Sequence, residues 1–278
     1  MKNKLILSLM ILLFTVSISF AQTEPPLDGV YQKNNVRTAS VTAYAPLREA
    51  DVLYTKRVWR VIDLKEKQNL PMTYPRAKLI DVIMDAVLAG ELTAYNPNPT
   101  GPKDFGDEFK VPMTPEEVAQ IGARSDTIPV EQLDGTIIDE VTTTTMNRDD
   151  VVEFRIKEEW IFDKQRSIFE PRIIGIAPIY IYKNTSGEEV ARGPIFWVYF
   201  NEARKVLAQS EVFNRQNDAM RMSYDDFFVQ RLFSSYIIKW SNERDQRIQD
   251  YVTGMDAIIE ANRIKQELFK WEHDLWEY

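Results

Sequence analysis

The sequence predicts an α+β protein in which an antiparallel β-meander, about residues 136–200, packs against N-terminal and C-terminal helices. Three observations lead to this prediction. Apolar residues recur at helical spacing before residue 90, follow strand patterns between residues 151 and 200, and return to helical spacing in the last third of the chain. A block of strands between two groups of helices is typical of an α+β fold.

The first 21 residues have the pattern of a secretory signal peptide. Lys2 and Lys4 precede an apolar run that ends with the small residues Ser19 and Ala21, so cleavage is expected before Gln22. An uncleaved anchor is the alternative, although the run is short for a membrane-spanning helix. We therefore expect the mature chain to be soluble outside the cytoplasm.

Composition limits the classes of function and the organisation of the mature chain. Without Lys2 and Lys4 the chain keeps 32 basic and 42 acidic residues, a formal charge of −10, so nucleic acid is not an expected partner. The absence of cysteine excludes disulfides, thiolate metal sites and thiol nucleophiles. We expect a flexible segment at residues 22–45, an α+β core domain at 46–240 and a helical segment at 241–278.

Three helices are predicted before the strands. Pro46 suits the first position of a helix over residues 47–67, where Leu47, Ala50, Tyr54, Val58, Val61 and Ile62 recur at helical spacing. A strand is the alternative there, because residues 52–62 are rich in β-forming side chains. A second helix ends at Gly90, and Thr114 opens a short third helix with a capping box.

The strand signal is clearest between Val151 and Phe200. In VVEFRIKEEWIFDKQ, residues 151–165, one face carries Val152, Phe154, Ile156, Glu158, Trp160 and Phe162. RIIGIAPIYIYK and PIFWVYF are apolar on both faces and are separated by the turn sequence NTSGEE, which indicates a three-stranded antiparallel meander. Residues 127–147, with four consecutive threonines, also favour extended structure.

Glu158 is the one acidic residue on the apolar face of this strand. A β-bulge after Ile156 would turn Trp160 and Phe162 outward, so we expect a simple register. An unpartnered buried carboxylate would cost several kcal/mol, and we therefore expect a basic or hydrogen-bonding partner in contact with Glu158, or exposure at the edge of the sheet. If Glu158 faced Ala177, Trp160 would face Gly175, and helical residues could fill the space above.

The last third of the chain is predicted to be helical. Asn201 can cap a helix over residues 202–213, Ser223 can cap another that includes residues 227–240, and Gly254 breaks the charged helix that follows. That helix carries a heptad seam of Ala257, Ala261, Ile264, Leu268, Trp271 and Leu275. Phe269 and Trp276 lie on another flank of it and are our candidates for a partner interface.

Enzyme interpretations have little support. The only histidine, His273, lies near the chain end without a neighbouring nucleophile, and no phosphate-loop, dinucleotide, serine-hydrolase or zinc-protease motif occurs. The alternative is a cell-wall glycoside hydrolase that pairs Glu158 with Asp225 or Asp226. The two aspartates, however, have an ordinary explanation in the first turn of a helix.

Calcium binding was the remaining chemical alternative. DFGDEF at residues 104–109 and NRDD at 147–150 collect oxygen ligands, but neither has the EF-hand spacing. We therefore predict no cofactor and no metal.

Long blocks of the sequence resemble a known family. They are YAPLREADVLYTKRVWRVIDLKEKQN, EFRIKEEWIFDKQRS with RIIGIAPI, and FWVYFNEARKVLA followed by SYDDFFVQRLFSSYI. Between Tyr44 and Ile238 the chain resembles the gliding motility protein N family. The resemblance implies a non-enzymatic periplasmic component of the type IX secretion system, which in gliding bacteria also supports the movement of surface adhesins.

The resemblance also implies partners. Members of the family associate with an outer-membrane lipoprotein of the gliding motility protein K type in a periplasmic ring, and they contact the periplasmic part of the inner-membrane motor complex. The family has no established catalytic motif to carry over. The interface role proposed for Phe269 and Trp276 and the buried, ion-paired role proposed for Glu158 therefore rest on residue patterning alone.

Overall fold

A computed structural model describes residues 36, 38–98, 106–131, 137–144, 146–184, 187–215, 217 and 219–274; residues 124–131 and 137–144 are described by their backbone alone. The predicted α+β fold with an antiparallel meander is confirmed. The predicted signal peptide and most of the segment predicted to be flexible, residues 22–45, lie outside the described residues.

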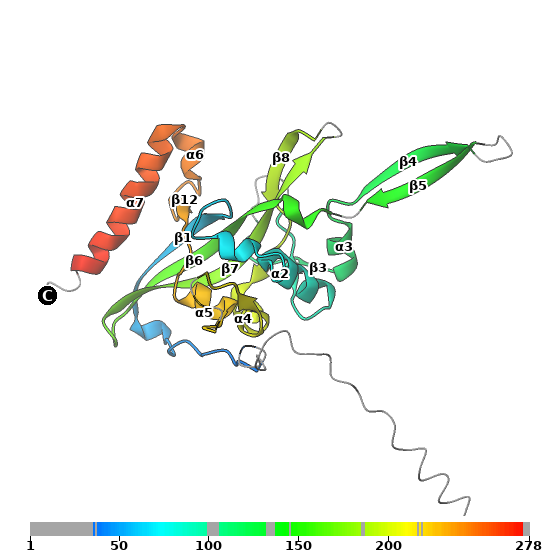
Figure 1. Cartoon of the computed structure of the whole chain (residues 1–278). Coiled ribbons are helices and arrows are strands. Elements are labelled where there is room, and N and C mark those ends of the chain that lie inside the picture. Colours follow the sequence, from blue (N-terminus) through cyan, green and yellow to red (C-terminus); the bar gives the residue numbers. More distant parts are fainter. Residues whose placement is uncertain are drawn as a thin grey trace, which may run out of the picture. The chain divides into compact units, whose positions relative to one another are not determined.

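One antiparallel sheet of eight strands organises the described fold (Figure 1). Its order is β12-β1-β6-β7-β9-β2-β3, and β8 pairs with β7 beside β9. The strands are β1 (Val52–Asp63), β2 (Ala94–Tyr95), β3 (Pro112–Met113), β6 (Val151–Asp163), β7 (Ile168–Lys183), β8 (Glu189–Pro194), β9 (Trp197–Tyr199) and β12 (Tyr236–Trp240). The strands β6, β7 and β9 correspond to the three strands of the predicted meander, and β8, which also pairs with β7, was not predicted.

Helices and two small ribbons complete the part of the chain that the structure describes. The α-helices are α2 (Leu79–Leu88), α3 (Pro115–Gln120), α4 (Phe200–Gln209), α5 (Tyr224–Val229), α6 (Ile248–Tyr251) and α7 (Met255–Asp274), and the 3₁₀ turns are η1 (Glu49–Asp51), η2 (Leu70–Thr73) and η3 (Arg148–Asp150). The ribbons pair β4 (Arg124–Glu131) with β5 (Ile137–Thr144) and β10 (Glu211–Val212) with β11 (Met222–Ser223). None of the described helices combines the length and apolar character needed to cross a membrane.

The helix predicted over residues 47–67 is wrong, because most of this segment is strand β1. The strand lies between β12 and β6, and its residues from Val58 to Ile62 are buried in succession. A strand covered on both faces has no polar side, so its apolar residues can mimic helical spacing. The β-branched and aromatic content of residues 52–62 was the better indicator.

The helix predicted over residues 227–240 is also wrong. Ser223 does cap α5, but this helix ends at Val229, and Arg231 then takes a positive φ of 54° that breaks the helical path. The chain returns as β12 and pairs with β1 at the edge of the sheet. The helix α4 begins at Phe200, one residue before the predicted cap at Asn201.

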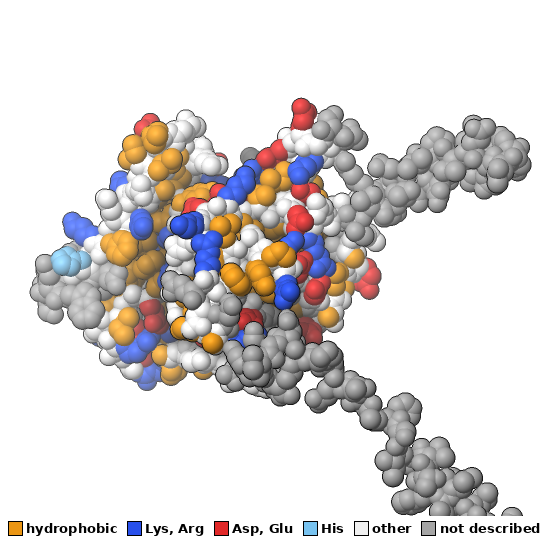
Figure 2. All heavy atoms as spheres, in the orientation of Figure 1, with side chains coloured by type: hydrophobic (Ala, Val, Ile, Leu, Met, Phe, Trp, Pro, Cys, Tyr) orange, Lys and Arg blue, Asp and Glu red, His pale blue; other side chains and the backbone are white. Residues whose placement is uncertain are grey.

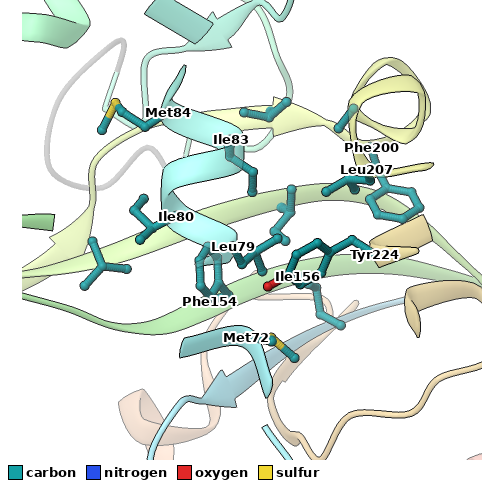
Figure 3. Packing of buried hydrophobic residues seen from close by; sticks show 14 of the residues in the cluster. Met72, Leu79, Ile80, Ile83, Met84, Phe154, Ile156, Phe200, Leu207 and Tyr224 are labelled. Carbon is teal, nitrogen blue, oxygen red and sulfur yellow. The ribbon is translucent and has the colours of Figure 1, made fainter. Parts of the chain in front are cut away.

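The larger core packs α2, α4 and α5 against one face of the sheet, and we call it the α2–α4–α5 core. Leu79, Ile80 and Ile83 of α2 point toward Phe154 and Ile156 of β6 (Figure 3). The apolar side chains of α2 recur every three to four residues and those of β6 every second residue, and the two apolar faces pack against each other. Among the side chains labelled in Figure 3, those of Leu79, Ile83, Ile156, Phe200 and Tyr224 are completely buried.

A smaller cluster, the α7 core, lies beneath α6 and α7. Its buried members are Val58, Phe169, Ile237, Ile248, Ile264 and Leu268. A third cluster, on the opposite face of the sheet, contains Trp59, Ala177 and Trp197. Strand alternation places adjacent β1 residues Val58 and Trp59 in these two different clusters.

The strands β6 and β7 do not pair in the register considered above, in which Glu158 would face Ala177. Glu158 stands opposite Ile173 and Trp160 opposite Pro171, because the turn between the strands spans only residues 164–167. The pairing shifts between Lys157 and Glu158, so an irregularity is present next to the position where a simple register was expected. The space above Gly175 is filled by the loop residue Phe109 and not by a helix.

Candidate interaction site

Glu158 lies in the middle of β6 and its side chain is completely buried. It stands opposite Val58 of β1 and Ile173 of β7. Its Oε1 accepts a hydrogen bond from Nη2 of Arg231 at 2.8 Å, and the guanidinium of Arg231 is partly exposed. The structure thus places a basic side chain against this carboxylate, from the turn that follows α5.

The pair of Glu158 and Arg231 separates two groups of apolar side chains. Ile156 belongs to the α2–α4–α5 core, whereas Trp160, four residues along the same face of β6, packs against the α7 core. Burial lowers the pKa of the nearby Arg60, and the negative charge of Glu158 opposes that shift. Glu158 therefore neutralises positive charge at the boundary between the two cores.

The carboxylates of the glycoside hydrolase alternative all have structural partners. Asp225 accepts hydrogen bonds from Nε and Nη2 of Arg204 at 2.7 and 2.9 Å, and both side chains are buried. The hydroxyl of Ser223, which caps α5, donates a hydrogen bond to Oδ2 of Asp226 at 2.7 Å. Together with the ion pair at Oε1 of Glu158, these contacts give each of the three carboxylates a partner within the protein, while Oε2 of Glu158 is buried without a hydrogen bond.

The loop considered for calcium binding instead attaches to the sheet. Asp107 accepts a hydrogen bond from Nε1 of Trp59 at 2.7 Å and lies 3.1 Å from Nζ of Lys157. Phe109, at a positive φ of 55°, sits over Gly175, where any Cβ atom would come within 2.5 Å of its ring. Across the residues that the structure describes, no group of three or more His, Asp or Glu side chains could hold a metal ion.

The same face of the sheet carries a desolvated arginine. Burial, together with the positive charge of Arg247, lowers the pKa of Arg155 to about 10. This lowered pKa is still far above neutral pH, so Arg155 stays charged. This face therefore combines aromatic side chains with cations that the loop carboxylate of Asp107 partly balances.

Helix α7 is attached to the sheet along the predicted seam. Ile264 and Leu268 are buried in the α7 core, and Ala257 and Ala261 pack partly buried beside them. One turn further on, Trp271 stacks on Tyr54 of β1 with ring centroids 4.9 Å apart. The seam ends within the described residues at Trp271, and Leu275 lies outside them.

The two ends of α7 both expose apolar side chains. At the first turn, Met255, Ile258 and Ile259 are 71%, 58% and 60% exposed, and we call them the apolar knob. Figure 2 shows hydrophobic side chains gathered at the corner where α6 meets α7. Exposed apolar groups that lie together in this way are typical of interaction surfaces.

The second apolar surface is a pocket near the other end of α7. Its volume is about 230 Å³, and its lining residues are Leu53, Tyr54, Phe162, Phe169 and Trp271. These side chains come from β1, β6, β7 and α7. We call it the apolar pocket, and its lining offers an incoming group almost no polar atoms.

Phe269, one of the two interface candidates, is 54% exposed on α7, with Nζ of Lys265 6.0 Å from its ring centroid. Trp276, the other candidate, lies outside the described residues. His273 is exposed near the end of α7. The exposed aromatic ring of Phe269 is thus presented by a helix whose opposite side is fixed to the sheet.

Two arginine side chains, which no sequence pattern predicted in this role, hold the segment before β1. Nη2 of Arg204 donates to the carbonyl of Thr42 at 2.7 Å, and Nη2 of Arg172 donates to that of Ala45 at 3.0 Å. The ring of Tyr44 lies 4.3 Å from the guanidinium of Arg204, and burial raises the pKa of its hydroxyl. The end of the segment predicted to be flexible is therefore held in place, and the charged Arg204 on the buried side of α4 was the available signal.

The boundaries of a known family coincide with the described fold. A family model described as gliding motility associated protein GldN matches residues 47–277. The match includes every described element from η1 to α7. No curated protein matches the chain.

Proposed function

The chain belongs to the GldN family of gliding motility associated proteins, and from that premise we propose that it is a non-enzymatic structural subunit of the type IX secretion and gliding machinery. The subunit forms part of a periplasmic ring. It links an outer-membrane lipoprotein of the gliding motility protein K type to the periplasmic part of the inner-membrane motor complex. The signal-peptide pattern of residues 1–21 supports export of the chain to that compartment.

The observation that carries the proposal is the incomplete burial of α7. Ile264 and Leu268 hold one side of the helix against the sheet, while Phe269 and the apolar knob remain exposed. A helix fixed in this way presents its exposed side chains with little loss of conformational freedom on binding. Such a surface supports a role in assembly, and Phe269 and Trp276 are the residues that we propose to meet a partner.

The ion pairs of the carboxylates support the non-enzymatic part of the proposal. Glu158 and Asp225 are each bound by an arginine, and the contacts hold segments distant in the sequence against each other. A catalytic pair would require both groups to face a common cleft. In the structure their contacts instead fasten α4, α5 and the following turn to one another and to the sheet.

Affinity purification of the tagged, exported chain from cell envelopes tests the proposal. We expect the lipoprotein and the motor component to co-purify with the wild-type chain, and a deletion strain to lose secretion and gliding. Phe269→Ala, alone and combined with Trp276→Ala, should reduce the recovered partner by about tenfold, since exposed aromatic anchors dominate interface energies. Val190→Ala on β8 is the matched control, because Val190 is also well exposed but lies on another element.

Three results would count against the proposal. A chain that purifies alone under gentle conditions would exclude a stable ring subunit. Normal secretion and gliding in the deletion strain would exclude an essential structural role. Unchanged recovery with the double aromatic variant would remove Phe269 and Trp276 from the interface and leave the rest of the proposal in place.

A further inference from the structure

Two separate apolar surfaces lie at different points along α7. The apolar knob of Met255, Ile258 and Ile259 lies at its first turn, and Trp271 of the apolar pocket lies sixteen residues later. At 1.5 Å per residue this separation is about 24 Å along the helix axis. A neighbouring molecule can therefore occupy one surface without blocking the other.

We propose that the knob of one copy of this chain inserts into the apolar pocket of the next copy. The inference rests on the proposed ring assembly and names the contact that builds it. Because the two surfaces differ and lie apart, the contact is heterologous, and each copy can offer one surface to each of two neighbours. Heterologous contacts produce closed rings when the rotation between copies closes, and open filaments when it does not.

Size and chemistry agree with this occupant. The pocket, with a volume of about 230 Å³, can accept aliphatic side chains but offers them almost no polar partner. The three knob residues are aliphatic or thioether side chains and are among the most exposed large apolar residues of the described chain. Moving them from water into the pocket is favoured by the hydrophobic effect on both surfaces.

Each surface has exposed side chains whose charge is opposite to that of exposed side chains at the other, although Glu267 also places negative charge near Tyr54 of the pocket. The exposed Asp250 and Asp256 flank the knob, close to the start of α7. The exposed Lys270 adjoins Trp271, and the exposed Lys164 is held next to the start of β1 by a hydrogen bond from its backbone N–H to the carbonyl of Asp51. Opposite charges at the rims favour the head-to-tail encounter and oppose contacts between two identical surfaces.

Disulfide crosslinking tests the contact directly, because the chain has no cysteine of its own. Ile259→Cys marks the knob and Leu53→Cys marks the pocket, and both positions are well exposed. The full chain is expressed in cells as each single variant, as the two singles together, and as the double variant. Envelope complexes are then separated on non-reducing gels, with Val190→Cys as the control for random collisions.

The expected result is a crosslinked dimer when the two single variants are mixed and a ladder of oligomers with the double variant. Each single variant alone should give no crosslink. Adding Met255→Asp to the double variant should reduce the ladder by about tenfold or more, since it places a charge in an apolar pocket. Melting curves of the purified variants check that each one is folded.

Three outcomes would overturn the inference. A dimer from Ile259→Cys alone would show that two knobs meet, and an intramolecular bond between Leu53→Cys and Trp276→Cys would show that the chain's own end fills the pocket. No crosslink in complexes that still contain the lipoprotein would exclude the contact while the proposed function stands. Loss of lipoprotein from the wild-type complex would instead count against the proposed function.

Discussion

Two groups of helices cover the sheet next to β6, and they differ in how completely they bury their apolar side chains. The α2–α4–α5 core continues through three helices and includes wholly buried residues such as Leu79, Ile83 and Phe200. The α7 core is smaller and is bordered by an apolar pocket and by the exposed knob. The first region thus buries its apolar side chains within the fold, whereas the second leaves apolar side chains exposed and available for contact.

The boundary between these regions is polar. Glu158 and Arg231 lie where the α2–α4–α5 core gives way to the side chains that pack under α7. A buried ion pair contributes little net stability when both partners are present, but it resists rearrangement because removing either partner is costly. The pair therefore keeps the two cores distinct and fixes the path of the chain into β12.

The largest loss of stability is expected for a substitution in the α2–α4–α5 core. Phe154→Ala should lower the free energy of unfolding by about 3–5 kcal/mol, because it removes a buried ring from a site with neighbours on all sides. Denaturant unfolding followed by tryptophan fluorescence measures the change. Phe154→Leu, which keeps most of the volume, is the control and should cost clearly less. A cost below about 1 kcal/mol for the alanine variant would contradict the description of this core.

A smaller effect is expected in the α7 core. Leu268→Ala should lower the free energy of unfolding by about 2–3 kcal/mol, at the low end of the range for such substitutions, because Trp271 and the nearby pocket leave room for the site to relax. The same unfolding experiment applies, with Ile264→Val as a milder neighbour. A loss equal to that of Phe154→Ala would remove the distinction between the two regions.

The smallest effect concerns the polar turn between β6 and β7. Asp163 accepts hydrogen bonds from Nε of Arg166 at 2.7 Å and from the backbone N–H of Gln165 at 2.8 Å. The hydrogen bond from Arg166 is the main cause that lowers the pKa of Asp163, and the backbone bonds add to it. This stabilisation is present above the unfolded-state pKa of about 4 and is lost as the pH falls through the lower folded-state pKa.

Asp163→Asn should therefore melt below the wild type at pH 7, and the two melting temperatures should converge as the pH falls through the lowered pKa of Asp163. Thermal melts between pH 7 and pH 2 measure the difference. Glu91→Gln, at an exposed position after α2, is the control and should follow the wild type. A constant difference at all pH values would mean that the variant disturbs packing and not a charge interaction.

Local signals in the sequence predicted the elements whose partners lie nearby. The alternation along β6 and the apolar runs of β7 predicted the meander, and the capping box at Thr114 marks the start of α3. The seam through Ile264 and Leu268 predicted the buried side of α7. In each case the spacing of apolar residues in the sequence matches the spacing of buried positions in the helix or strand.

The remaining features depend on contacts between distant segments. Helical and strand patterns coincide where β1 is buried on both faces, so spacing alone could not exclude a helix there. The register of β6 against β7 depends on a four-residue turn with Ser167 at a positive φ. The apolar pocket could not be predicted, since its lining extends from Leu53 to Trp271.

The pairing of β12 with β1 has a consequence for the order in which the chain can fold. Val58 pairs with Trp240, so the outer edge of one of the earliest strands is covered by one of the last to be synthesised. Until β12 arrives, β1 presents unpaired backbone groups along an apolar strand, which is a template for aggregation. Contacts between such distant segments also form slowly. The nascent protein therefore has a vulnerable interval that ends only when its C-terminal part reaches the sheet.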